Sequence, residues 1–253
     1  LYVQDLERIR ENAARLRRAF PNADIAYAVK ANTTRAVLST LERVGVDAEC
    51  AAAGEVQRSL DAGFPPNRIR YTAVNPPAAD LDHVWSIDGV DEMTITVGAR
   101  DTLDRVAERG FNGRLCVRVN PGVGAGHHQK VSTGAEPKFG VPYGRAAEFC
   151  RAASERGFDV VGVHAHAGSG ISGDDLSAHR ELVERMADLT RELERDGLVP
   201  AFVAVGGGFG VPYRPEEAPI DLQRVATATR QALGETTARL AIEPGRYFVA
   251  DAG

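Results

Sequence analysis

Short runs of alternating hydrophobic and polar residues recur along the chain, and each predicts a β-strand with two unlike faces. In residues 24–30, the apolar side chains at 25, 27 and 29 alternate with Ala26, Ala28 and Lys30. Successive side chains of a strand point to opposite faces, so Lys30 shares its face with alanines. The same alternation places ionisable side chains on one face of four further strands: Glu49, Arg118, His164 with His166, and Glu243.

Strand and helix patterns alternate over the whole chain. The predicted strands are residues 24–30, 46–50, 68–73, 92–97, 114–120, 160–166, 202–205 and 239–243. The predicted helices are residues 3–20, 34–44, 54–62, 79–85, 99–109, 145–156, 174–196 and 222–233. A sheet covered by helices on both faces would show unbroken apolar runs, so the ionisable face requires a barrel lumen. Eight strands with helical crossovers predict an α/β fold, a TIM-like (βα)8 barrel.

The composition of the chain limits the classes of molecule that it is expected to bind. With 253 residues and 43% hydrophobic content, the chain is predicted to form one domain over residues 1–253. Its net charge of -5 argues against nucleic acid and against an anionic membrane as partners. Cys50, Cys116 and Cys150 lack metal-ligand spacing and are interpreted as reduced core residues, which favours a cytoplasmic location. The sequence begins at Leu1 and stops just past a strand, so we expect an excerpt of a longer protein.

Glycine-rich connections follow the last two strands. Gly206, Gly207 and Gly208 come after the seventh strand, and residues 243–246 (EPGR) come after the eighth. Barrels often bind phosphate with these two connections, because backbone N–H groups without a Cβ can approach an anion closely. Arg246 would add a bidentate charge. The alternative interpretation is a tight turn with close packing of strand and helix.

Lys30 and Glu243 complete a set of groups suited to a cofactor. A lysine at a barrel mouth, partly removed from water, is expected to titrate lower and to attack a carbonyl as an amine. The alternative is a strand-end lysine that reaches solvent. An amine nucleophile, a phosphate cradle and an acid able to keep a ring nitrogen protonated are the three supports that pyridoxal phosphate requires.

Other polar residues admit more than one interpretation. His166 would stack on the cofactor ring, and Ser169 would donate to its phosphate or to a neighbouring group. Arg118 and Glu49 would orient the ring hydroxyl, the histidine or Lys30, or would form a structural ion pair in the lumen. His164 and His166 could instead be two ligands of a zinc site, although no third ligand is evident. The long loop over residues 121–143 is predicted to be functional, and its two histidines, at 127 and 128, to lie at the surface.

Four motifs, in order, resemble the fold-type III pyridoxal phosphate decarboxylases: residues 27–32 (YAVKAN), 164–170 (HAHAGSG), 206–208 (GGG) and 243–246 (EPGR). Residues 118–121 (RVNP), His128, residues 132–134 (STG) and 138–140 (KFG) look more like the diaminopimelate decarboxylase branch than the ornithine or arginine branches. The resemblance implies an alanine-racemase-like barrel, with the family's C-terminal β domain absent from this chain.

The resemblance also implies roles for individual residues. Lys30, His166 and Glu243 would be catalytic: Lys30 attaches pyridoxal 5'-phosphate, His166 stacks on its ring and Glu243 pairs with its pyridine nitrogen. Arg246 would also contact a substrate carboxylate. The remaining cofactor-binding residues would be Glu49, Arg118, Ser169, Gly206, Gly207, Gly208, Gly245 and Arg246.

The implied activity is decarboxylation of meso-2,6-diaminopimelate to L-lysine, the last step of lysine biosynthesis. The partners would be an amino-acid substrate and, in the full-length protein, a second copy in a homodimer, with no nucleic acid or membrane. Alternatives are a decarboxylase acting on ornithine, arginine or carboxynorspermidine, a non-catalytic pyridoxal phosphate carrier, and a metal-dependent hydrolase that uses His164 and His166.

Overall fold

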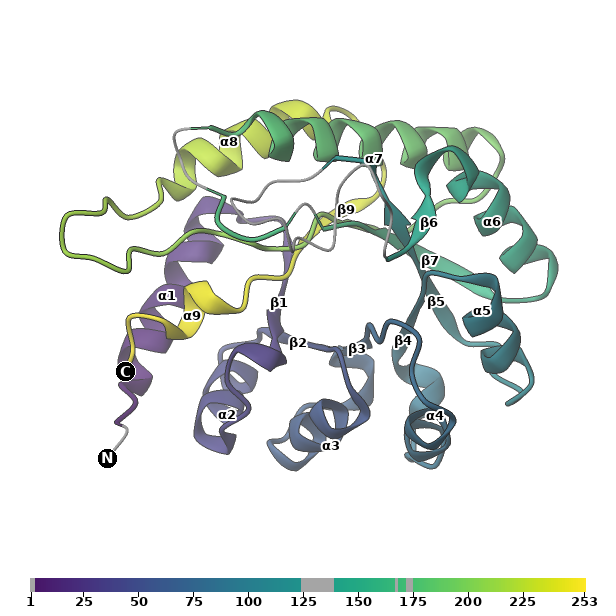
Figure 1. The fold of residues 1–253 in the computed structure, drawn as a ribbon, viewed down its shortest axis with the longest axis horizontal. Helices are drawn as coiled ribbons and strands as arrows, with labels where there is room; N and C mark the ends of the chain where they lie inside the picture. Colours follow the sequence, from purple (N-terminus) through teal and green to yellow (C-terminus); the bar gives the residue numbers. More distant parts are fainter. Residues whose placement is uncertain (1–2, 124–138, 167, 172–174) are drawn as a thin grey trace.

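Eight parallel strands close into a ring in the computed structural model of the protein, which describes residues 3–123, 139–166, 168–171 and 175–253. The ring runs β1, β2, β3, β4, β5, β7, β8, β9 and closes because β9 pairs with β1. Helices surround this ring (Figure 1). The predicted TIM-like (βα)8 barrel is therefore confirmed.

The strands match the predicted ones in number and order. They are β1 (Asp24–Ala28), β2 (Asp47–Cys50), β3 (Ile69–Tyr71), β4 (Thr94–Val97), β5 (Arg114–Asn120), β7 (Asp159–His164), β8 (Phe202–Ala204) and β9 (Arg239–Ile242). A further two-residue strand, β6 (Val141–Pro142), pairs with the end of β5 outside the ring. It falls within the stretch predicted as a loop, because two residues are too few to show alternation.

Five strands (β1, β3, β7, β8 and β9) end earlier than predicted, and in three of them this places a predicted site residue in the connection that follows the strand. Lys30 lies in a single 3-10 turn (Val29–Ala31) beyond β1, His166 lies two residues beyond β7, and Glu243 follows β9 directly. The prediction that Lys30, His166 and Glu243 sit on strand faces is therefore wrong. All three residues still follow the carboxyl ends of their strands, so they reach the same mouth of the barrel.

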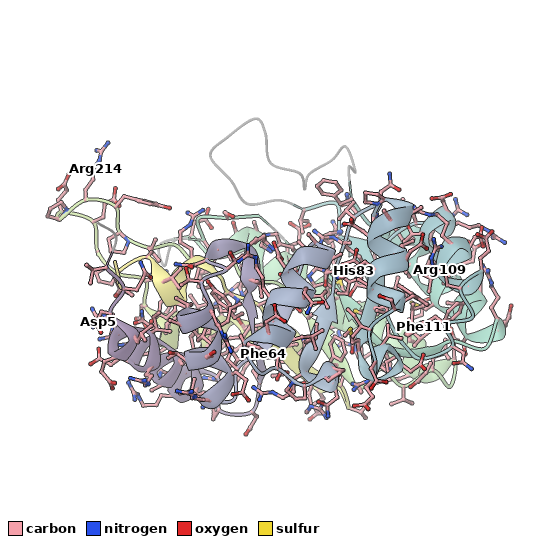
Figure 2. The ribbon with its side chains drawn as sticks, turned by 90° about the horizontal axis from the view of Figure 1, so that it is seen from below. Asp5, Phe64, His83, Arg109, Phe111 and Arg214 are labelled. Carbon is pink, nitrogen blue, oxygen red and sulfur yellow. The ribbon has the colours of Figure 1, made fainter. Side chains whose placement is uncertain are left out.

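The helices are α1 (Leu6–Ala19), α2 (Arg35–Arg43), α3 (Ala53–Asp61), α4 (Ala78–Trp85), α5 (Arg100–Ala107), α6 (Tyr143–Glu155), α7 (Ser177–Arg195), α8 (Leu222–Leu233) and the short α9 (Arg246–Val249). Helix α1 begins later than predicted because the Asp5 side chain accepts hydrogen bonds from the N–H groups of Glu7 and Arg8, which caps the helix (Figure 2). Helix α7 begins at Ser177, so Asp175 precedes it instead of lying in its first turn.

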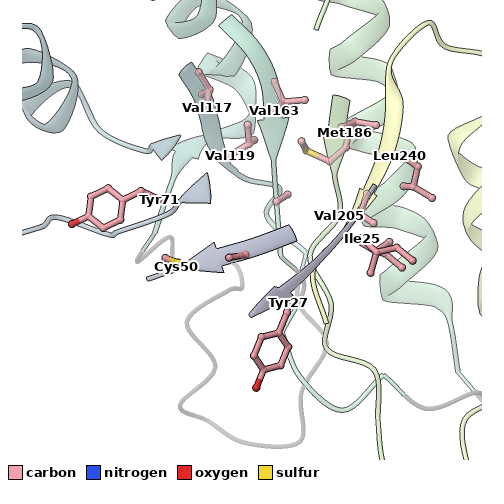
Figure 3. Close-up of a cluster of buried hydrophobic side chains, with 14 of the residues drawn as sticks. Ile25, Tyr27, Cys50, Tyr71, Val117, Val119, Val163, Met186, Val205 and Leu240 are labelled. Carbon is pink, nitrogen blue, oxygen red and sulfur yellow. The ribbon is translucent and has the colours of Figure 1, made fainter. Parts of the chain in front are cut away.

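The apolar strand faces pack outward against the helices. Val117 and Val163 are register partners on β5 and β7, and Met186 of α7 belongs to the same buried cluster (Figure 3). Burial of this branched apolar surface supplies the main driving force for folding. The three cysteines are buried and free, as their interpretation as reduced core residues requires. Within the described ranges, no helix has the length and apolar content needed to cross a membrane.

His179 gives the stability of the barrel a predictable pH dependence. Its Nε2 lies 2.7 Å from Thr229 Oγ1 between α7 and α8, and burial lowers its pKa to about 4. An unfolded chain binds this proton near pH 6.5, so the contribution is present above that pH and is lost as the pH falls towards 4. We expect the free energy of unfolding to fall by at most about 1.4 kcal/mol per pH unit from this residue.

Urea unfolding of the wild type and of His179→Gln at pH 7 and pH 5 measures this effect. The glutamine amide can still donate to Thr229 but carries no titrating proton, so the variant should lose less stability between the two pH values. Equal losses in the two proteins would contradict the assignment.

Candidate active site

A cavity of about 890 Å³ opens at the carboxyl ends of the strands. All the residues predicted to bind the cofactor contribute to its wall: Lys30, Glu49, Arg118, His166, Ser169, Gly206, Gly207, Gly208, Glu243, Gly245 and Arg246. These residues come from distant parts of the sequence, and the closed ring brings them to one hollow. The cavity is the expected place for an active site in a barrel of this type.

Lys30 is held at the cavity by Glu49. Its Nζ lies 3.1 Å from Glu49 Oε2; the lysine side chain is 59% exposed and the glutamate side chain only 5% exposed. Burial lowers the pKa of Lys30, but attraction by Glu49, Glu243 and Glu55 outweighs it, so the pKa is raised overall. The expectation that this lysine titrates lower is therefore wrong, because the sequence argument counted desolvation and not the carboxylates.

Glu243 sits at the floor of the cavity between two partners. Its Oε1 accepts a hydrogen bond from Arg70 Nη1 at 3.1 Å, and its Oε2 lies 3.0 Å from His164 Nε2. Burial alone would raise the pKa of Glu243, but His164 and Arg70 oppose it and the net direction is downward. The side chain therefore remains a carboxylate at neutral pH, the form able to accept a proton or to pair with a cation.

Burial lowers the pKa of both His166 and Arg118 on the cavity wall. Burial, reinforced by the charges of His164, Arg118 and Lys30, lowers the pKa of His166 to about 3, although its side chain is only partly shielded from solvent. The ring is thus neutral and suited to stacking. The Arg118 guanidinium lies 5.9 Å from the Phe139 ring centre and forms no ion pair within the described residues. The alternative of an Arg118–Glu49 lumen pair is not what the structure shows, because Glu49 pairs with Lys30 instead.

The glycine run forms a wall of bare backbone. A Cβ at Gly206 would overlap His166, a Cβ at Gly207 would lie 2.5 Å from the Glu243 carbonyl oxygen, and a Cβ at Gly208 would overlap the Gly168 carbonyl. These glycines are therefore required for close packing, as the alternative interpretation held. They also line the cavity, and their N–H groups have no acceptor in the part of the chain that the structure describes. The same glycines therefore allow close packing and leave backbone N–H groups available to a bound anion.

Ser169 and Arg246 lie on the exposed side of the same cavity. The Arg246 guanidinium lies 5.6 Å from the ring centre of Tyr213, in the connection between β8 and α8. Figure 2 shows this connection extending away from the helices, with Arg214 near its tip. Arg246 is thus an exposed cation at the mouth of the cavity, without a carboxylate partner among the described residues.

Sequence reasoning missed Arg70, the buried partner of Glu243. The period-two pattern that revealed the other lumen residues also applies to residues 69–72, where Arg70 and Thr72 alternate with Ile69 and Tyr71. The role of His164 beside Glu243 was also missed, since this residue was considered only as a metal ligand. No cluster of three metal-ligating residues exists among the described side chains. His127, His128, residues 132–134 and Lys138 lie outside the described residues.

Comparison with known proteins identifies the family. The family described as "Pyridoxal-dependent decarboxylase, pyridoxal binding domain" matches residues 6–250. The chain belongs to this family. The family match accounts for a barrel with a cavity of this kind, and it agrees with the resemblance carried by the four motifs.

Two curated relatives of this chain are named diaminopimelate decarboxylases. The chain is 41% identical to the diaminopimelate decarboxylase of Methanothermobacter thermautotrophicus and 34% identical to that of Aquifex aeolicus, with all of this chain aligned in both cases. It covers 61% and 60% of the length of these relatives. A crystal structure of the diaminopimelate decarboxylase of Helicobacter pylori complexed with L-lysine superposes with a TM-score of 0.91 at 31% identity, covering 100% of this chain and 64% of that one.

The residues of the cavity fit the pyridoxal phosphate that this family binds. A primary amine, a neutral imidazole and an ionised carboxylate belong to residues that line one cavity. The glycines in the same wall have N–H groups without an acceptor among the described residues. The Lys30 amine can react with the aldehyde, and the glycine N–H groups with Arg246 can bind the phosphate. The negative charge of Glu243 complements a protonated ring nitrogen. The donor set therefore suits the cofactor in each of its three polar parts.

Proposed function

We propose that this chain is the cofactor-binding barrel of a diaminopimelate decarboxylase, which converts meso-2,6-diaminopimelate to L-lysine as the last step of lysine biosynthesis. The observation that carries the proposal is the gathering of Lys30, His166, Glu243 and the glycine wall at one cavity. The activity for which these relatives are named supports the choice of substrate. The family's homodimer and a cytoplasmic location belong to the same proposal, and the free cysteines suit a reducing compartment.

The cofactor supplies one kind of chemistry: when bound, pyridoxal phosphate accepts the electron pair left on the α-carbon as a carboxylate leaves. The chain's own residues do the rest. Lys30 would hold the cofactor through its side-chain amine. Glu243 would favour a proton at the ring nitrogen, because a buried carboxylate favours a cation opposite it.

The remaining residues bind and orient. His166, neutral at physiological pH, offers a flat face to the ring without adding charge. The N–H groups of residues 206–208 and the Arg246 guanidinium bind phosphate. Glu49 holds the Lys30 ammonium at 3.1 Å and keeps the amine at the cavity when no carbonyl compound is attached.

A second hollow adjoins the first at Arg118. It has a volume of about 390 Å³ and shares Thr72, Val74, Arg118 and Phe139 with the main cavity. Arg118 has no carboxylate partner among the described residues, so it is available to a negatively charged group of a bound molecule. The combined space suits a substrate longer than the reacting α-amino acid alone.

A substrate panel tests this proposal. Purified, cofactor-loaded full-length protein is offered meso-diaminopimelate, ornithine, arginine and carboxynorspermidine, and release of carbon dioxide is measured for each. We expect kcat/KM for meso-diaminopimelate to exceed the others by at least about 100-fold, the discrimination typical of a site that pairs a polar group at the far end of its substrate. A preference for ornithine, arginine or carboxynorspermidine would replace the proposed substrate, and cofactor binding without turnover of any compound would indicate a carrier.

A further inference from the structure

Arg70 occupies the interior of the barrel, below the cavity floor. It is the middle residue of β3 and is only 8% exposed. Taking a guanidinium out of water is costly unless the charge is paired and its N–H groups are hydrogen-bonded. The surroundings of this residue therefore need a specific account.

Three kinds of contact hold the Arg70 guanidinium. Its Nη1 donates to Glu243 Oε1 at 3.1 Å, and its Nη2 lies 3.9 Å from both Asp47 Oδ2 on the adjacent strand β2 and Asp24 Oδ2 on β1, one strand further round the ring. Its Cζ also lies 4.7 Å from the ring centre of Phe202. The arginine thus links a pair of carboxylates lower in the lumen to Glu243 at the cavity floor.

The strand opposite is shaped to allow this arrangement. A Cβ at Gly162 of β7 would overlap the Phe202 ring, so the absence of a side chain there makes room for the ring inside the barrel. The ring in turn supports the guanidinium by a cation–π contact. Gly162, Phe202 and Arg70 form a packed stack that fixes the position of the charge beside Glu243.

Of the two groups that bind the Glu243 carboxylate, only Arg70 carries a charge that is independent of pH. An arginine stays protonated throughout the range in which proteins fold, whereas His164 can donate its Nε2 proton to Glu243 as a neutral ring. His164 Nδ1 is buried and has no partner within the described residues. The permanent positive charge at hydrogen-bond distance from Glu243 therefore comes from Arg70 alone among the described side chains.

We propose that Arg70 is a positioning residue that keeps Glu243 ionised and fixes the direction of its carboxylate towards the cofactor cavity. The inference rests on the proposed function for its catalytic consequence, but not for its effect on Glu243 itself. The titratable and charged groups that surround the pair come from every packed strand: His164 on β7, Cys116 and Arg118 on β5, Lys30 after β1, Asp24 on β1 and Asp47 on β2.

Three substitutions separate charge from packing. Arg70→Met keeps much of the side-chain volume and removes the charge, Arg70→Gln keeps a hydrogen-bond donor without the charge, and Arg70→Lys keeps the charge. If charge is what matters, the methionine and glutamine variants behave alike and the lysine variant restores most of the wild-type behaviour. If Arg70 only fills space, the lysine and glutamine variants behave alike.

The first readout needs no cofactor. In protein labelled with ¹³C at the glutamate side-chain carboxyl, the resonance missing from Glu243→Gln identifies Glu243. In the wild type this resonance should keep its ionised position down to the lowest pH at which the protein folds. In Arg70→Met and Arg70→Gln the midpoint of the Glu243 titration should move towards neutral pH, to a proton concentration at least about tenfold lower than in the wild type. This is the effect expected when one adjacent buried charge is removed.

The second readout uses the cofactor-loaded protein. In the two neutral variants kcat should fall about 10- to 100-fold with little change in KM, the range common when the outer partner of an active-site group is lost. The acidic limb of the pH profile should also move upward, and Arg70→Lys should recover most of the activity.

An unchanged Glu243 titration in a folded neutral variant overturns the inference, even if activity falls. If Arg70→Met does not fold, Arg70→Gln carries the same test. Failure of the substrate panel leaves the titration experiment intact, so the two proposals fail separately.

Discussion

Replacing Lys30 by alanine is expected to abolish covalent attachment of pyridoxal phosphate and to lower turnover by about 10⁴-fold or more, the scale seen when a covalent nucleophile is removed. Lys30 is the amine that lies at the cavity, held 3.1 Å from Glu49. Reduction of the loaded protein with borohydride, followed by mass spectrometry of its peptides, should place the added mass on Lys30 in the wild type and nowhere in Lys30→Ala.

Lys30→Arg is the matched control for this prediction. It keeps a cation beside the buried Glu49 carboxylate but offers no free amine, so it should preserve the stability of the empty protein and still lose attachment. Cofactor mass found on Lys130 or Lys138 in either variant would refute the assignment of Lys30. These two are the remaining lysines of the chain, and they lie outside the described residues.

Glu243→Gln is expected to retain the cofactor and to lower kcat by about 100- to 1000-fold, comparable to the loss of one preorganised electrostatic group in an active site. The amide is nearly isosteric but cannot hold a proton at the ring nitrogen by charge. Cofactor content measured by absorbance and kcat measured by carbon dioxide release test the two halves of the prediction separately.

Glu42→Gln provides the comparison. Glu42 also accepts a hydrogen bond from an arginine, at 3.1 Å from Arg68 Nη1, but it lies at the end of α2 near the start of the strands and does not line the cavity. Its substitution should leave kcat within about twofold, since changes at partly exposed ion pairs have small effects. Near-normal turnover in Glu243→Gln would refute the role given to that carboxylate.

The barrel could be predicted from the sequence because each strand of a closed parallel sheet has one face against the helices and one face towards the lumen. The two faces carry different residue types, which therefore alternate along the strand. The alternation in residues 114–120 and 239–243 revealed both the outward core residues and the inward ionisable ones. Strand ends were harder to place. The pattern through residues 24–30 continues unbroken, while the backbone leaves β1 after Ala28 and turns.

The contents of the cavity were predictable and the interactions between them were not. Alternation showed that Lys30 and Glu49 face inward, but only the strand register determines that they pair with each other. Arg70 was missed although it obeys the same alternation, because it lies in the middle of its strand and not at the carboxyl end, where the candidate site residues were sought. The direction of the Lys30 pKa depended on carboxylates contributed by other strands and a neighbouring helix, which no local stretch of sequence reveals.

The Lys30–Glu49 pair has a consequence for how the empty protein acquires its cofactor. An ammonium held by a nearly inaccessible counterion is a poor nucleophile, so the unloaded barrel keeps its reactive amine in a latent form. Capture of an aldehyde must discharge that ammonium and leave Glu49 without its cation. The rate at which the empty protein attaches its cofactor should therefore depend on proton release from Lys30 and increase with pH.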